Sequence, residues 1–157
     1  TRTEQAIDRL YYERGGIIGG TSAGAAVMSE VMITGNEWIN KDSTNIFHCI
    51  QAKNVETKRG FGLIKNAIID QHFMMRKRHN RLIAVVLEHP GLLGIGIDEE
   101  GAILVYPDGG FRVYGQDAVI VYDARKARNI HTGANGLLGA KNIRVDLLLP
   151  GDYYKIN

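Results

Sequence analysis

Residues 17–31, which read IIGGTSAGAAVMSEV, predict a strand, a sharp turn and a helix in immediate succession. The apolar pair at 17–18 suits a short strand, and residues 25–31 have the composition of a helix. Between them, residues 20–24 match the pattern Gly-x-Ser-x-Gly, which is typical of a nucleophile elbow. Small neighbours in this motif allow a cramped backbone that exposes the hydroxyl of Ser22. A glycine-rich turn capped by a serine is the simpler alternative.

A serine hydroxyl is a weak nucleophile, so the elbow requires a histidine within hydrogen-bonding reach. Of the five histidines, His72 alone follows a predicted strand, residues 67–70, and precedes a predicted helix, residues 76–88. The carboxyl edge of a parallel sheet is where an elbow also opens, so His72 is the candidate base. A strand-end histidine bonded only to backbone is the alternative.

The third member of such a site is a carboxylate that orients the imidazole. Glu37 lies between Ser22 and His72 in a polar segment, residues 35–53, which predicts a long loop. We therefore expect the chain order Ser, Glu, His, with Glu56 and Asp70 as rivals.

The rest of the chain predicts a mixed α/β domain. Residues 4–13 have helical spacing and end at two glycines. Beyond Gly91 the pattern changes to short β-rich runs, at residues 93–97, 102–106, 111–114, 118–122 and 143–149. Residues 107–110 give a strong hairpin signal and residues 115–117 a weaker one. Together these features predict a mixed sheet with helices on its faces, within the later part of a larger domain.

Composition limits the possible classes of protein. The 157 residues suit one domain, and a net charge of +2 from 19 basic and 17 acidic side chains gives no reason to expect a nucleic-acid partner. No apolar stretch reaches the ~18 residues of a membrane span, so we expect a soluble protein. We expect it in the cytoplasm. Cys49 is the single cysteine, which excludes an internal disulfide.

Two segments of the chain together resemble the cyanophycinase family. The first is residues 19–26, and the second is Asp70-Gln71-His72-Phe73 followed by three arginines, Arg76, Arg78 and Arg81. Residues 96–99, Gly-Ile-Asp-Glu, add to the resemblance. Members of this family are similar to the aspartyl dipeptidase called peptidase E, and their fold is flavodoxin-like or class I amidotransferase-like.

The resemblance implies a serine-type exopeptidase that hydrolyses cyanophycin, multi-L-arginyl-poly-L-aspartate, to β-Asp-Arg dipeptides through an acyl-enzyme. Ser22 would be the nucleophile, His72 the base and Glu37 its orienting carboxylate, with the Ala23 N–H in the oxyanion hole. The resemblance places five residues in the substrate pocket: Asp70, Gln71, Arg76, Arg78 and Arg81. Asp70 suits a guanidinium group and the arginines suit carboxylates. No metal or cofactor is implied.

The family resemblance also implies that residues 1–157 form the C-terminal portion of a larger α/β peptidase domain. We expect a companion chain that holds the N-terminal half, and a homodimer. Two alternatives stay open: a peptidase that cleaves only short aspartyl or other dipeptides, and a catalytically silent, amidotransferase-like binding domain.

Overall fold

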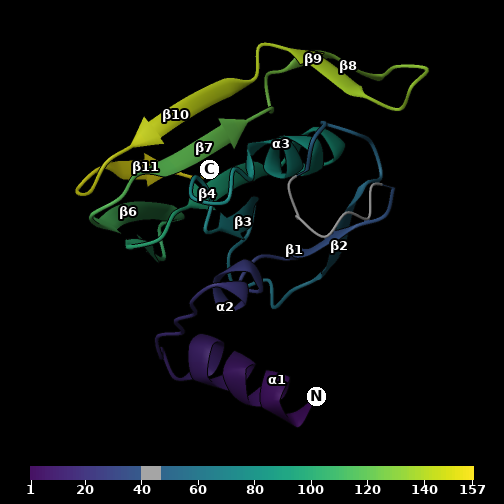
Figure 1. The fold of residues 1–157 in the computed structure, drawn as a ribbon. Helices are drawn as coiled ribbons and strands as arrows, with labels where there is room; N and C mark the ends of the chain where they lie inside the picture. Colours follow the sequence, from purple (N-terminus) through teal and green to yellow (C-terminus); the bar gives the residue numbers. More distant parts are fainter. Residues whose placement is uncertain (40–46) are drawn as a thin grey trace.

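In the computed structural model, residues 1–39 and 47–157 are described. Four helical segments occur among them: α1 (Arg2–Asp8), the π-helical turn η1 (Arg9–Glu13), α2 (Ala23–Ala26) and α3 (His79–Glu88). The strands are β1 (Val31–Glu37), β2 (Val55–Arg59), β3 (Ala67–Gln71), β4 (Leu93–Ile97), β5 (Gly101–Val105), β6 (Gly110–Gly115), β7 (Val119–Asp123), β8 (Arg128–Thr132), β9 (Leu138–Lys141), β10 (Arg144–Leu148) and β11 (Tyr153–Lys155). The fold is α/β and rich in strands (Figure 1).

The central sheet has the strand order β10-β7-β4-β3. β3 and β4 are parallel and are connected through α3, whereas β4–β7 and β7–β10 are antiparallel. β4 and β7 are buried along their whole length, as expected for strands covered on both faces. The parallel register pairs Gln71 with Ile97, so both strands end at the same edge of the sheet.

Two apolar clusters cover the two faces of this sheet. On one face, Leu82 and Val85 of α3 pack with Ile68 of β3. On the other face, Phe111 of a second sheet, ordered β11-β6-β5, packs with Ile95 of β4. The second face is therefore covered largely by a sheet, with the short helix α2 at its margin.

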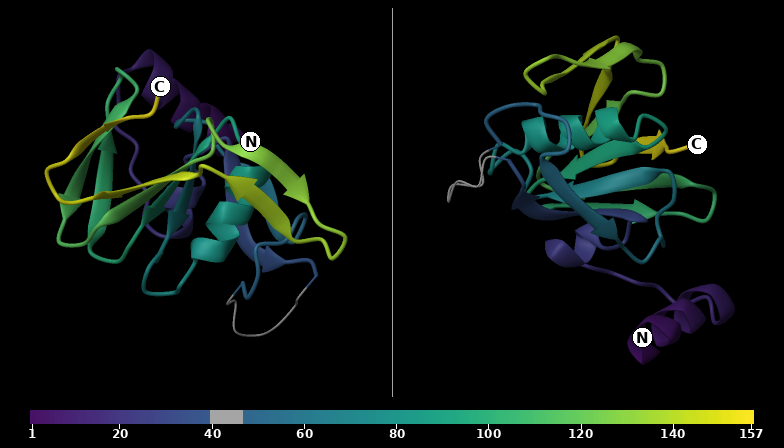
Figure 2. Two further views of the ribbon diagram at one scale, coloured as in Figure 1. Left: turned by 90° about the horizontal axis from the view of Figure 1, so that it is seen from above. Right: turned by 90° about the vertical axis from the view of Figure 1, so that its right-hand side faces the viewer.

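The N-terminal helix lies apart from the sheets (Figure 2). α1 begins with a capping box in which Thr1 and Glu4 bond each other's backbone, and it contains no buried residue. Of the helices that the structure describes, none has the length and apolar character needed to cross a membrane.

The structure differs from the sequence predictions on both sides of the elbow. Within the described part of the chain, Ile17 pairs with no strand, and its side chain is 86% exposed. The helix expected to run to residue 31 ends at Ala26 instead. Val31 already begins β1, because this segment pairs with residues up to Arg59 in β2.

Part of the loop expected at residues 35–53 is strand instead, and the turn at residues 115–117 does not form the expected hairpin. Residues 35–37 belong to β1, while residues 40–46 of the expected loop lie outside the described residues. The signal at 107–110 does join β5 to its antiparallel partner β6, with Gly109 at φ 77°. Residues 115–117 instead lead from β6 into the central sheet, because β6 and β7 belong to different sheets.

Gly96 leaves the space that the ring of Phe73 fills. A Cβ at Gly96 would lie 2.4 Å from two atoms of that fully buried ring. We expect Gly96→Ala to destabilise the protein by about 1–3 kcal/mol, because an overpacked core must shift. Chemical denaturation measures this loss.

Gly91→Ala is the matched control, since a Cβ at Gly91 would meet nothing within 4 Å. It should be neutral or stabilise the fold by up to about 1 kcal/mol. Equal effects of the two substitutions would contradict this account of Gly96.

Candidate active site

Ser22 and His72 lie in direct hydrogen-bonding contact. The distance from Ser22 Oγ to His72 Nε2 is 2.9 Å. Ser22 immediately precedes α2 and has φ 53° and ψ −123°, a conformation that a non-glycine residue rarely adopts. The backbone of Ser22 thus has the strain that a nucleophile elbow requires, and its side chain remains exposed to a substrate.

The two glycines of the elbow have different surroundings. A Cβ at Gly20 would lie 2.2 Å from the carbonyl oxygen of Gly24 and 2.7 Å from Met28, so a side chain has no room there. A Cβ at Gly24 would meet nothing within 4 Å. The close approach of the two backbones therefore requires a glycine at position 20 and leaves space at position 24.

A buried serine fixes the elbow beside β3. Ser29 Oγ accepts a hydrogen bond of 3.0 Å from the N–H of Ile69, and Ser29 forms an isolated parallel bridge with Ile64. Since Ile69 is three residues before His72, this contact sets the position of α2 relative to the end of β3. Figure 1 shows α2 just below β3.

The carboxylate at the other side of the imidazole is Glu99. Its Oε1 lies 2.8 Å from His72 Nδ1. Parallel pairing of β3 with β4 explains the contact, because residues that follow the two strands emerge at one edge of the sheet. When Nδ1–H is donated to Glu99, Nε2 is left as an acceptor for the Ser22 hydroxyl. These three side chains form the hydrogen-bonded series that activates a serine in hydrolases.

Glu37, the expected orienting carboxylate, is not at His72. It ends β1 opposite Val55 of β2, is buried, and accepts a hydrogen bond of 2.7 Å from Asn54 Nδ2. Its rival Glu56 lies on β2 and accepts from Asn36 Nδ2 at 2.8 Å. The sequence reasoning missed Glu99 because it took chain order as the guide. The signal was present: Glu99 follows the next strand after His72.

Ala23 is placed where an oxyanion donor is needed. It is the first residue of α2, so its N–H has no acceptor within the helix. A carbonyl attacked by Ser22 would develop its negative charge beside the N–H that follows the nucleophile.

Asp70 and Arg81 form a buried ion pair and do not line an open pocket. Arg81 Nε donates to Asp70 Oδ2 at 2.8 Å, and Arg81 Nη2 donates to Asp70 Oδ1. The exposed fractions of the two residues are 1% for Asp70 and 2% for Arg81. Arg81 also lies over the ring of Phe47, 5.5 Å from its centroid. The expected contacts of Asp70 and Arg81 with a substrate therefore give way to a contact with each other.

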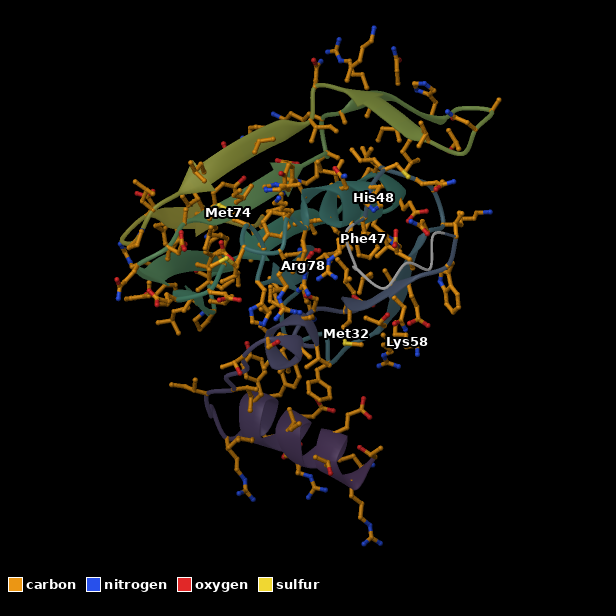
Figure 3. All side chains as sticks on the ribbon, in the orientation of Figure 1. Met32, Phe47, His48, Lys58, Met74 and Arg78 are labelled. Carbon is orange, nitrogen blue, oxygen red and sulfur yellow. The ribbon has the colours of Figure 1, made fainter. Side chains whose placement is uncertain are left out.

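Arg78 supports the backbone next to His72. Its Nη1 donates to the carbonyl oxygen of Gln71 at 2.6 Å and lies 3.9 Å from Asp70 Oδ1. Burial and, to a smaller extent, the neighbouring charge of Arg81 lower the pKa of Arg78 to about 10, while the charge of Asp70 opposes the shift. The side chain thus stays protonated at neutral pH. Figure 3 shows Arg78 near the middle of the molecule.

Gln71 and Arg76 are the two remaining residues of the expected pocket. Gln71 Oε1 is 3.5 Å from Ser22 Oγ, and Arg76 is exposed in the turn after His72. Both are accessible to a bound molecule. Within residues 1–39 and 47–157, no group of three or more His, Cys, Asp or Glu side chains could hold a metal ion.

Several known peptidases are similar to the chain in sequence. The sequence profile of peptidase family S51 matches residues 1–113. Cyanophycinases from Synechococcus elongatus and Trichormus variabilis are 36% and 38% identical to the chain over 151 and 148 residues, which cover 92% and 91% of it. The chain spans less than half of each relative, 44% and 47% of their lengths.

A solved structure shares the fold. The crystal structure of a peptidase from an acI-B1 Actinobacterium superposes with a TM-score of 0.53 at 20% sequence identity. The match covers 89% of this chain and 46% of the other. At this identity the likeness concerns the fold alone.

The contact of Glu99 with His72 predicts that Glu99, and not Glu37, is required for the reactivity of Ser22. Glu99→Gln should slow the reaction of Ser22 with a serine-directed fluorophosphonate by about 10²–10⁴-fold, because an amide no longer stabilises the imidazolium. Mass spectrometry of the labelled protein measures the rate. Glu37→Gln is the control and should change the rate less than about 3-fold, since Glu37 bonds Asn54. A larger loss of rate in Glu37→Gln than in Glu99→Gln would instead indicate that Glu37 orients His72.

The ion pair of Asp70 with Arg81 makes a prediction about stability. Asp70→Asn should cost about 3–5 kcal/mol, because it leaves a buried guanidinium without its counter-charge. Asp146→Asn should cost less than about 1 kcal/mol, because its partner Arg144 is largely exposed. Urea denaturation compares them. A stable Asp70→Asn protein with a raised KM would instead indicate that Asp70 binds substrate.

Proposed function

The chain belongs to peptidase family S51, and from this premise we propose that it is a serine-type peptidase that hydrolyses cyanophycin to β-Asp-Arg dipeptides. The observation that carries the proposal is the series Ser22–His72–Glu99, with contacts of 2.9 and 2.8 Å. The cyanophycinases that are 36–38% identical to the chain support the choice of substrate.

In the proposed reaction, Ser22 Oγ attacks the scissile carbonyl carbon while His72 Nε2 takes its proton. Glu99 holds Nδ1–H and stabilises the imidazolium that forms. The N–H of Ala23 donates to the developing oxyanion. His72 then returns the proton to the leaving amine, and an acyl-enzyme remains on Ser22. Water, deprotonated by the same imidazole, releases the dipeptide product and restores the serine.

The polymer carries an arginine on each aspartate side chain, so a site for it must accommodate guanidinium and carboxylate groups. We propose that Gln71 and Arg76 supply contacts of this kind. Their accessibility supports this, because Arg76 is exposed and Gln71 is only partly buried next to Ser22. A planar guanidinium such as Arg76 suits a substrate carboxylate.

We further propose that the described strands belong to a flavodoxin-like, class I amidotransferase-like sheet, with α3 on one face and the short helix α2 at the margin of the other face, which is otherwise covered by a sheet. The unit β3–α3–β4, with parallel strands and a helix between them, supports this arrangement. A companion segment and a homodimer remain part of the proposal. Ile17 is exposed in a segment where a short strand was expected, and this observation favours the companion chain.

Incubation of the purified protein with cyanophycin, followed by chromatography, tests the function. Intact mass spectrometry first establishes which chains are present. β-Asp-Arg should accumulate with the wild-type protein and fall below detection with Ser22→Ala, because removal of the nucleophile blocks acylation.

Two other outcomes would replace the proposal. Cleavage of short aspartyl peptides without cleavage of the polymer would identify a dipeptidase. Failure of Ser22 to react with a fluorophosphonate, in a protein whose full complement of chains is present, would identify a silent binding domain.

A further inference from the structure

The turn that carries His72 has an anchor outside the hydrogen-bonded series. Between residues 72 and 78 the backbone closes on itself: the N–H of Arg76 donates to His72 O, that of Lys77 to Met74 O and that of Arg78 to Phe73 O. The N–H of Met75 points elsewhere. It donates to both carboxylate oxygens of Asp98, at 3.2 and 3.1 Å.

Asp98 is placed to act on this turn because it directly follows β4. The last pair of the parallel register is Gln71 with Ile97, so His72 and Asp98 come next on the two strands. Asp98 is only 8% exposed, and its side-chain acceptor atoms meet at one backbone N–H. Burial of a carboxylate costs free energy unless hydrogen bonds satisfy it. The bonds from the Met75 N–H therefore offset part of the cost of burying Asp98.

His72 itself requires such support. Its φ is 47°, a left-handed conformation that is strained for a residue with a side chain. Strained backbone persists only where the surrounding structure over-determines it. On the side before His72, Arg78 holds the carbonyl oxygen of Gln71. On the side after it, Asp98 holds the N–H of Met75.

We propose that Asp98 is a positioning residue for His72. Its carboxylate fixes the turn that presents the imidazole, while its neighbour Glu99 fixes the ring. The two acidic residues therefore have separate tasks: Glu99 acts through charge and a bond to Nδ1, and Asp98 acts as a hydrogen-bond acceptor for the backbone. The proposal rests on the proposed function only in giving His72 the role of base.

Loss of this anchor lets the turn relax and the ring move away from Ser22. A displacement of about 1 Å at a reacting group costs on the order of 100-fold in rate. Asp98→Ala should therefore lower kcat by about 100-fold. The change in KM should be smaller than this, because Gln71 lies on β3 outside the turn, although Arg76 lies within it. Asp98→Asn keeps one acceptor oxygen and should recover activity to within about 10-fold of wild type.

Asp123→Ala is the matched control. Asp123 is also 8% exposed and accepts a backbone N–H, that of Arg125, at 2.9 Å. It pairs with Leu93, at the opposite end of β4 from Asp98. This substitution should lower the melting temperature at least as much as Asp98→Ala, because Asp123 also loses its ion pair with Arg125. Below that temperature kcat should stay within about 2-fold of wild type, since His72 is not affected.

Two further measurements do not depend on the substrate. In ¹⁵N-histidine-labelled protein, the downfield proton resonance of the His72 Nδ1–H reports its hydrogen bond to Glu99. This resonance should broaden or shift in Asp98→Ala and return in Asp98→Asn. The rate of fluorophosphonate labelling of Ser22 should fall by about 100-fold in parallel.

The outcomes separate the two proposals. A wild-type protein that leaves cyanophycin intact, yet shows the expected changes in resonance and labelling, would overturn the substrate and support the role of Asp98. An Asp98→Ala protein with wild-type kcat, labelling rate and His72 resonance would overturn the role of Asp98. An equal loss of kcat in Asp98→Ala and Asp123→Ala would also overturn it, because the effect would then follow stability alone.

Discussion

The site depends on the parallel pairing of β3 with β4. Neighbouring strands have their carboxyl ends at the same edge of a sheet only when they are parallel, and here that edge receives His72 from one strand and Asp98 and Glu99 from the other. α3, which connects the two strands, buries its apolar side on one face of the sheet and thereby stabilises the pairing. The contact between His72 and Glu99 thus follows from the direction and register of the two strands that carry these residues.

Two non-glycine residues with strained backbone lie where this edge meets the elbow. Ser22 and His72 both have positive φ. Such strained backbone persists only where surrounding contacts hold it in place. The Asp70–Arg81 pair beneath them is buried, and Arg78 extends this cluster to the carbonyl of Gln71. Three of the charged residues that the family resemblance assigns to a substrate pocket, Asp70, Arg78 and Arg81, therefore bond one another or the backbone beside His72.

Prediction from the sequence came closest to the structure where a signal is local. The elbow motif singled out Ser22, and a histidine at the end of an apolar strand singled out His72; the structure places the two side chains within hydrogen-bonding distance. β3, β4 and β5–β7 lie close to their expected positions because apolar runs between turns define short strands. β8 was missed because residues 128–132 are mostly polar and exposed, so they carry no apolar alternation. The strand expected at residues 17–18 is absent from the described structure because strand formation requires a partner.

The sequence by itself determined the candidate pair Ser22 and His72, the strand–helix–strand unit that becomes β3, α3 and β4, and the family to which the motifs point. Only the tertiary structure decided which carboxylate meets His72 and whether Asp70 faces a substrate or Arg81. The physical reason is the same in both cases. A glycine-rich turn or an apolar run is a property of neighbouring residues, whereas a contact between Glu99 and His72 depends on the register and direction of two strands, which a linear pattern does not encode.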